Sequence, residues 1–260
     1  MVDRRGRVLP VALLLVLLVS LSISPILAQP APAAAPQPAA ADKALAWLRN
    51  QQQPDGGFAA FGGASDASVT ADAVYAFAAG GVHPSQVVSG EGAGPIDYLL
   101  AVAPQEAANP GRAAKLVLAL HVAGENPRLA NGVDLVNAIE LSLNGETGLY
   151  GESFFGHTLA ILALQSQGAP VAPAAIDAIY SAQTPEGSWG FTGESFQGAG
   201  DSNTTAMAIQ ALAAVAGDPV VIARGLDYLR SLQNAEDGSI SYDSLSVGDP
   251  GGDANSTALA

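Results

Sequence analysis

The chain contains no cysteine, few basic residues and few aromatic residues. The lack of cysteine excludes disulfide bonds, thiol nucleophiles and cysteine-ligated zinc. Only 10 Lys and Arg residues stand against 24 Asp and Glu residues, which gives a formal net charge of −14. This charge opposes contact with a phosphate backbone, so we expect no nucleic-acid partner. Aromatic residues make up 6% of the chain and hydrophobic residues 49%, so the core must consist largely of Ala, Leu, Val and Ile.

Residues 1–28 have the features of a secretory signal peptide. Three arginines near the N-terminus precede an almost wholly apolar run over residues 8–26, and cleavage is expected after Ala28. The same run is nearly long enough to span a bilayer if it is not cleaved. Residues 29–41 (QPAPAAAPQPAAA) lack apolar periodicity and contain four prolines, so they predict an extended Ala/Pro/Gln-rich spacer. We therefore expect an extracytoplasmic protein, secreted or at the cell surface, with no membrane insertion after signal cleavage.

A helical repeat occupies the rest of the chain, residues 42–260. Each block pairs one helix, a Gly-rich turn and a second, Ala-rich helix, with a period of about 45 residues. One helix pair cannot bury its apolar face alone, so neighbouring pairs must stack. No segment alternates like a strand, which predicts an all-α fold of about nine helices, an open solenoid or an α/α toroid. The second helices are expected from Thr70, Ala113, His157, Thr205 and Thr257.

The helix before the third turn shows the expected amphipathic pattern. Val221, Gly225 and Tyr228 fall on one face of this helix, and Arg224 and Arg230 are expected to face solvent. The last second helix stops soon after it starts, at Ala260, without a capping repeat. We therefore expect the array to be incomplete or open at its C-terminus.

Acidic, amide and hydroxyl side chains recur at the start of the second helices. Such residues are typical N-caps, which accept hydrogen bonds from free N–H groups of the first turn. If several of them surround a cavity, they could instead bind calcium, with Asp249 and Glu194 as further oxygen donors. The recurring sets are Asp66-x-Ser68-x-Thr70, Asp201-x-Asn203-x-Thr205 and Asp253-x-Asn255-x-Thr257.

The Gly-rich turns share a spacing of Gln, Gly and a large apolar residue. The pattern resembles the QW-type repeats of the prenyltransferase and squalene-cyclase α/α-toroid superfamily, over about residues 43–260. The resemblance implies that each Gln caps a helix end, stacks on the aromatic residue and ties outer helices together. The matching sets are Gln52, Gly56 and Phe58, then Gln183, Gly187 and Trp189, and then Gln233, Gly238 and Ile240, of which only Trp189 supplies the Trp.

A second similarity concerns the helix start Asp201-Ser202-Asn203-Thr204-Thr205. It is similar to helix starts in the toroid domain of the cobalamin carriers intrinsic factor and transcobalamin, which implies a corrinoid ligand. Those carriers complete the corrinoid site with a separate small β domain, and this chain contains none. A corrinoid site built from this chain alone would be only half complete.

The enzymes of the superfamily have recognisable motifs that this sequence lacks. It has no Asp-x-Asp-Asp acid motif, no Cys for zinc or a thioester, and no Gly-x-Ser-x-Gly. We therefore expect a non-catalytic ligand-binding or interaction module, with a corrinoid or a lipid or terpenoid as the small-molecule ligand. Two alternatives stay open: a terpene cyclase or prenyltransferase-type enzyme with its acid motif in further sequence, and a structural cell-surface repeat protein. The enzyme would need an aromatic-lined cavity, whereas the composition suggests an Ala-lined one. The sequence identifies no cofactor and no metal.

The aromatic residues gather around two matching turns, Gly151-Glu152-Ser153-Phe154 and Gly193-Glu194-Ser195-Phe196. If the inner helices enclose a cavity, these turns are expected to form its rim. The predicted ligand contacts are Tyr150, Phe154, Phe155, Trp189, Phe191, Phe196, Asp201 and Asn203.

Overall fold

The computed structural model describes residues 38–247 and 252–260. The predicted signal peptide and most of the spacer lie outside the described residues. Residues Ala39–Ala260 form one compact unit. The described residues form ten α-helices and two short 3-10 helices and contain no β-strand, which confirms the all-α prediction. None of these helices combines the length and the apolar character that crossing a bilayer requires.

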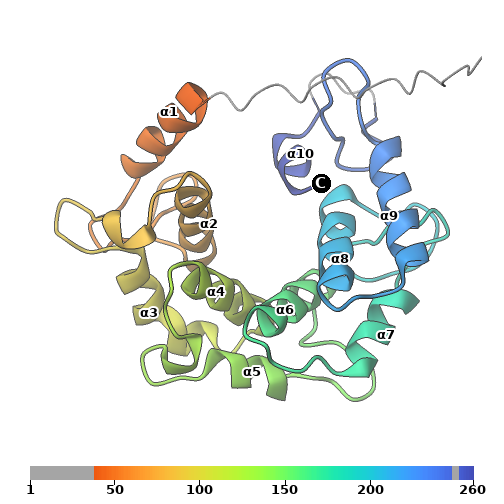
Figure 1. Ribbon diagram of the computed structural model, residues 1–260, viewed down its shortest axis with the longest axis horizontal. Coiled ribbons are helices and arrows are strands. Elements are labelled where there is room, and N and C mark those ends of the chain that lie inside the picture. Colours follow the sequence, from red (N-terminus) through yellow and green to blue (C-terminus); the bar gives the residue numbers. More distant parts are fainter. Residues whose placement is uncertain (1–37, 248–251) are drawn as a thin grey trace, which may run out of the picture. The chain divides into compact units, whose positions relative to one another are not determined.

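The α-helices of this unit alternate between an outer and an inner layer (Figure 1). Consecutive inner helices from α2 to α10 pack against one another in an arc, which is open between α10 and α2 (Figure 1). The outer helices are α1 (Pro38–Arg49), α3 (Pro95–Glu106), α5 (Leu135–Leu141), α7 (Pro173–Ser181) and α9 (Pro219–Ser231). The inner helices are α2 (Ala67–Ala79), α4 (Pro110–Val122), α6 (Phe154–Ser166), α8 (Ser202–Ala214) and α10 (Ala254–Leu259). The 3-10 helices are η1 (Pro84–Gln86) and η2 (Pro127–Leu129).

Helix α1 begins inside the segment predicted to be a spacer. Pro38 is its first residue, so the spacer prediction for residues 38–41 is corrected. Proline is tolerated in the first turn of a helix, and the three alanines that follow have the highest helix propensity. Most of α1 is exposed, and its Leu45 and Leu48 pack against a small core cluster that includes Phe77.

The inner helices begin with a recurring N-cap. In each, the cap side chain accepts a hydrogen bond from the N–H of the third helical residue, which confirms the capping interpretation. Each predicted starting residue lies three positions inside its helix, because the sequence comparison aligned the fourth helical residue rather than the first. The five caps are Asp66, Asn109, Ser153, Asp201 and Asp253.

The core lies between the two layers, where the inner helices are buried more completely than the outer ones. Its largest fully buried side chain is Trp189, whose indole N–H donates to the Ile179 carbonyl oxygen at 2.8 Å. Helix α9 packs against this indole through Gly225, where an added Cβ would lie 2.8 Å from Trp189 Cζ3. As predicted, Gly225 and Tyr228 form part of the buried face of α9.

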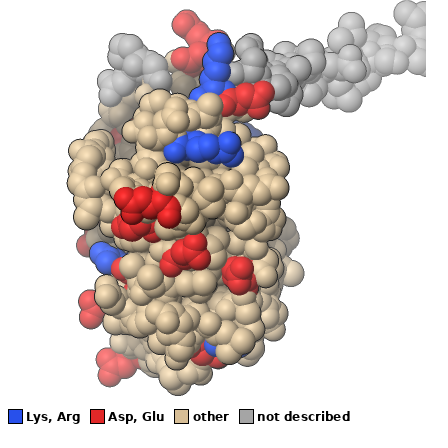
Figure 2. Space-filling view, turned by 90° about the vertical axis from the view of Figure 1, so that its left-hand side faces the viewer, with Lys and Arg blue, Asp and Glu red and all other residues tan. Residues whose placement is uncertain are grey.

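Ion pairs contribute little to this unit. The face over α1 to α3 carries scattered acidic side chains on a largely uncharged surface (Figure 2). The shortest pair among the described residues, Arg230 with Asp227, joins two side chains that are 68% and 73% exposed. Pairs as exposed as this are worth about 1 kcal/mol or less. Apolar packing and backbone hydrogen bonds therefore stabilise the fold.

Two glycines allow the N-terminal ends of α4 and α6 to approach closely. A Cβ added to Gly111 would lie 2.9 Å from the Cα of Gly156, and one added to Gly156 would lie 3.2 Å from the Cα of Gly111. Because the obstructing atoms belong to the backbone, a larger side chain cannot be accommodated by a rotamer change. The spacing of α4 and α6 therefore depends on this pair.

We predict that Gly111→Ala lowers the free energy of unfolding by about 1–3 kcal/mol, because the clash with α6 outweighs the helix propensity of Ala. Gly145→Ala is the matched control, since nothing lies within 4 Å of a Cβ at that position. Urea unfolding of both variants measures the difference. Equal midpoints for the two variants would contradict the proposed contact.

Candidate ligand-binding cleft

The turn before an inner helix is tied to that helix through its backbone. The N–H of Trp189 donates to Thr205 Oγ1 at 3.0 Å, and its carbonyl oxygen accepts from the N–H of Asp201 at 3.0 Å. In the same way, the N–H of Phe58 donates to Thr70 Oγ1, and its carbonyl oxygen accepts from the N–H of Asp66. The N–H of Ile240 donates to Thr257 Oγ1, and its carbonyl oxygen accepts from the N–H of Asp253. In three repeats, therefore, the large turn residue is fixed to both the cap and the fourth residue of the next inner helix.

In the repeat of α6, His157 takes the place of the threonine, as its alignment with Thr70 and Thr205 predicted. Its Nδ1 accepts the N–H of Tyr150 at 3.0 Å, so its Nε2 carries the proton and donates to the Ala175 carbonyl oxygen at 2.9 Å. The side chain is fully buried, and this burial lowers the pKa of His157 to about 4, although the bond to Ala175 acts in the opposite direction. The imidazole is therefore a neutral structural link.

The repeat glutamines close the Gly-rich turns. Gln52 and Gln183 each donate from Nε2 to the carbonyl oxygen of the glycine four residues on, at 2.9 Å. Gln183 also donates to the Val221 carbonyl oxygen in α9 at 2.9 Å and accepts from Arg224 Nη1 at 3.0 Å. The tie between outer segments is thus present at Gln183. Arg224 is exposed, as predicted, and its guanidinium also donates to this turn.

The concave side of the arc contains a cleft of about 930 Å³. Five inner helices contribute to it, and its wall is mostly apolar. Alanine contributes only Ala214, so the composition-based expectation of an Ala-lined cavity is wrong. Prominent members of the wall are Leu118 and Val122 of α4, Leu159 and Leu162 of α6, Met207 of α8 and Leu259 of α10.

Four of the eight predicted ligand contacts line this cleft: Phe155, Phe191, Asp201 and Asn203. The rings of Phe155 and Phe191 stack with centroids 5.9 Å apart and an interplanar angle of 26°. Phe191 is 57% exposed, so it is not a core residue. The structure thus brings an aromatic pair and a carboxylate to one end of the cleft.

The other four predicted contacts lie elsewhere. Trp189 is fully buried in the core, and Phe196 is 60% exposed outside the cleft. Phe154 is 1% exposed beneath the turn before α6. Tyr150 is also buried, and its hydroxyl accepts the N–H of Ala172. The sequence could not distinguish core aromatics from cleft aromatics, because the two kinds lie only one or two residues apart. Buried Phe154 precedes Phe155, and buried Trp189 lies two residues before Phe191.

Asp201 caps α8 and lines the cleft with 4% of its surface exposed. Its carboxylate accepts the N–H of Thr204 at 2.7 Å. Burial raises the pKa of Asp201, while neighbouring donors, including the backbone N–H groups of Thr204 and Phe191, act to lower it. The opposite wall holds a second carboxylate, Asp72, which is paired with Lys115 Nζ at 2.8 Å.

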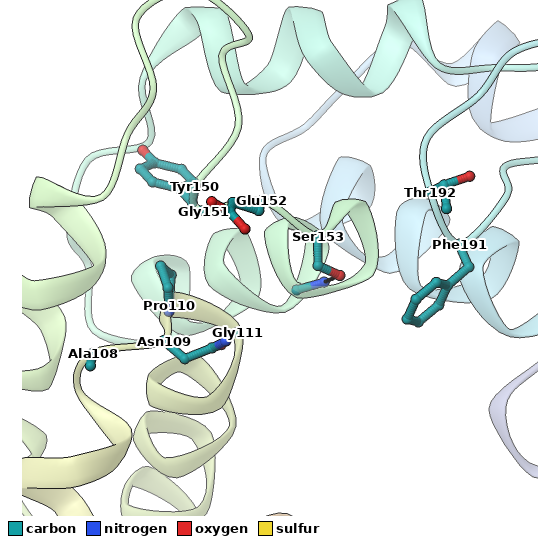
Figure 3. A pocket seen from close by; sticks show the side chains of 11 residues that line it. Ala108, Asn109, Pro110, Gly111, Tyr150, Gly151, Glu152, Ser153, Phe191 and Thr192 are labelled. Atoms are coloured by element: carbon teal, nitrogen blue, oxygen red, sulfur yellow. Dashed lines mark hydrogen bonds between the residues drawn. The ribbon is translucent and has the colours of Figure 1, made fainter.

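A smaller pocket of about 670 Å³ lies at the ends of the inner helices (Figure 3). It is formed by residues 108–111, by the turn before α6 and by Phe191 and Thr192. The Asn109 and Ser153 side chains already accept helix N–H groups as caps. Glu152 also faces this pocket, whose lining is more polar than that of the inner cleft, so the mostly apolar inner cleft is the stronger candidate for a small-molecule site.

The calcium hypothesis gains no support from the described residues. They contain no group of three or more His, Asp or Glu side chains that could hold a metal ion. Asp201 and Asp253 act as caps, Glu194 is exposed, and Asp249 lies outside the described residues.

Sequence comparison found no relative, whereas comparison of structures did. No protein-family model and no curated protein matches the chain. Among solved structures, ent-copalyl diphosphate synthase from Streptomyces platensis is similar, with a TM-score of 0.53 and 21% sequence identity. The match covers 73% of this chain and 39% of that enzyme. The chain therefore has the fold predicted from its repeats: all-helical and resembling the α/α toroid of a terpene cyclase.

We predict that Gln183→Ala lowers the free energy of unfolding by about 2–3 kcal/mol, because three hydrogen bonds at about 1 kcal/mol each are lost. Gln233→Ala is the control, since the one side-chain bond that Gln233 forms with the described residues, to the Gly238 carbonyl oxygen, is exposed and 3.2 Å long. We expect a loss below about 1 kcal/mol for the control. Equal losses in urea unfolding would show that Gln183 does not tie the turn to α9.

We also predict that the free energy of unfolding decreases at acidic pH because of His157. The pKa of His157 is about 4 in the folded protein and near 6.5 in the unfolded chain, so the unfolded chain binds the proton first. The native state therefore loses up to about 3 kcal/mol between pH 6.5 and pH 4 and keeps its full stability above that window. His157→Thr, the residue found in this position in other repeats, removes this component. Parallel pH profiles of unfolding for the two proteins would contradict the prediction.

Proposed function

We propose that the chain is an exported, non-catalytic module that binds a small molecule between its inner helices. The observation that carries the proposal is the cleft of about 930 Å³, with a mostly apolar wall and polar side chains on several of its helices, including Asp201 and Asn203 at the start of α8. This combination is typical of small-molecule sites. The N-terminal signal pattern and the net charge of −14 support a place outside the cytoplasm.

The carboxyl groups of the cleft do not form the acid motif of a cyclase. Asp72 is paired with Lys115 Nζ at 2.8 Å. Asp201 caps α8 and accepts the N–H of Thr204, and its burial raises its pKa. A cyclase of this superfamily needs a protonated Asp within an Asp-x-Asp-Asp motif, and the sequence has no such motif.

Two alternatives remain. The similarity to ent-copalyl diphosphate synthase favours a cyclase or prenyltransferase-type enzyme, because this chain covers only 39% of that protein and an acid motif could lie in further sequence. A purely structural surface repeat would have the same fold and would bind no ligand.

Thermal unfolding of the full chain tests the proposal. We predict that at least one ligand raises the Tm, because a molecule that binds only the native state stabilises it. The panel comprises a corrinoid, calcium chloride, a polyprenyl diphosphate and short amphiphiles of positive, negative and zero charge. Leu162→Trp, which fills the cleft, should abolish the shift. Leu141→Trp, at a 78% exposed position of α5, should preserve it.

Two results would contradict the proposal. If no ligand raises the Tm, the structural repeat is favoured. If chromatography shows that the polyprenyl diphosphate is converted to product, the protein is an enzyme. Export is tested separately by the N-terminal peptide of the protein recovered outside the cytoplasm, which is expected to begin at Gln29.

A further inference from the structure

One end of the inner cleft presents an aromatic surface that the fold does not bury. Phe191 is stacked on Phe155 yet remains 57% exposed, and Tyr242, on the same lining, is 44% exposed. The face of an aromatic ring carries partial negative charge and attracts a cation that lies over it. An exposed aromatic pair at a cleft therefore favours a cationic or apolar ligand group.

The charges of the lining leave one carboxylate without a counterion. The charged residues of the cleft are Asp72, Lys115 and Asp201. Asp72 and Lys115 neutralise each other, whereas Asp201 forms no ion pair with any residue that the structure describes. Asp201 is 4% exposed yet borders the cleft, so the lining holds one carboxyl group without a counterion beside the aromatic pair.

A buried acceptor next to Asp201 also lacks a hydrogen-bond donor. Asn203 Oδ1 is buried and has no hydrogen-bond partner among the described residues. Asn203 lines the cleft beside Asp201. A buried acceptor without a partner is costly, and a ligand N–H group would remove that cost.

We propose that the cleft binds an amphipathic organic cation, with an ammonium group between Asp201, Asn203 and the Phe155–Phe191 pair. The apolar part of the ligand then lies along α4, α6 and α8, against Leu118, Leu162 and Met207. This inference rests on the proposed binding function and specifies its ligand class.

The same groups disfavour the other ligand classes. An anion would meet the carboxylate of Asp201 in a partly desolvated site, where like charges repel strongly. A neutral lipid would cover that carboxylate without pairing it, which carries a desolvation cost. A metal ion would need several charged or imidazole ligands, and the described residues form no such group.

Isothermal titration calorimetry at pH 7 with three six-carbon probes tests the inference on the full chain. Hexylammonium, 1-hexanol and hexanoate share one apolar chain and differ in the charge of the head group. We expect hexylammonium to bind at least about tenfold more tightly than either of the others, because only the cation pairs with Asp201 and the aromatic faces.

Asp201→Asn removes the charge and keeps the cap, since Asn is as good an N-cap as Asp. We expect it to weaken hexylammonium binding by about tenfold. The matched control is Asp66→Asn, which alters the equivalent cap of α2 outside the cleft. Phe191→Leu should weaken binding by about threefold to tenfold, whereas Phe196→Leu, at a similarly exposed ring, should not.

The outcomes separate this inference from the proposed function. If 1-hexanol or hexanoate binds as tightly as hexylammonium, the cation inference fails and the cleft remains a binding site. If hexylammonium binds equally to Asp201→Asn and Asp66→Asn, its site lies elsewhere and the inference also fails. If neither these probes nor any of the larger ligands binds, both proposals fail.

Discussion

The fold depends on one backbone group in four of the five repeats: the N–H of the large residue in the Gly-rich turn. It donates to the fourth residue of the following inner helix, a threonine in three repeats and His157 in another. The bond fixes the turn to the inner layer, while the turn glutamine closes the loop and, at Gln183, reaches the next outer helix. Because the bond is directional, it fixes the register of the turn against the inner helix, which non-directional apolar contacts do not.

The candidate site follows from the same constraint. The backbone N–H of Trp189 donates to Thr205, and its carbonyl oxygen accepts from Asp201. The two ends of the segment 190–200 are therefore held next to each other at the start of α8. Phe191, two residues after the fixed Trp189, therefore lies beside the N-terminus of α8 together with Asp201. An aromatic ring and a carboxylate are thereby brought together at the cleft, although ten residues separate them in the sequence. The position of the site thus follows from the hydrogen bonds of Trp189 to Thr205 and Asp201.

The sequence predicted the repeat layout, the inner-helix caps and the equivalence of His157 with the threonines, because each depends on local spacing and local hydrogen bonds. It did not predict the composition of the cleft. Leu118, Leu162 and Met207 lie on helices that bear apolar residues on both the cleft face and the core face, so periodicity cannot tell the two faces apart. Nor did it predict that the exposed Arg224 donates to the turn at Gln183, because that turn lies about 40 residues away in the sequence.

Amide hydrogen exchange measured by NMR tests most directly whether the turn N–H groups hold the layers together. The account predicts that the amides of Phe58, Tyr150, Trp189 and Ile240 exchange slowly, at rates close to those of inner-helix amides. Exchange as fast as that of the exposed turn glycines, such as Gly62, would mean that these bonds open independently of the core. In that case apolar packing alone would hold the layers, and the position of Phe191 beside Asp201 would not be fixed.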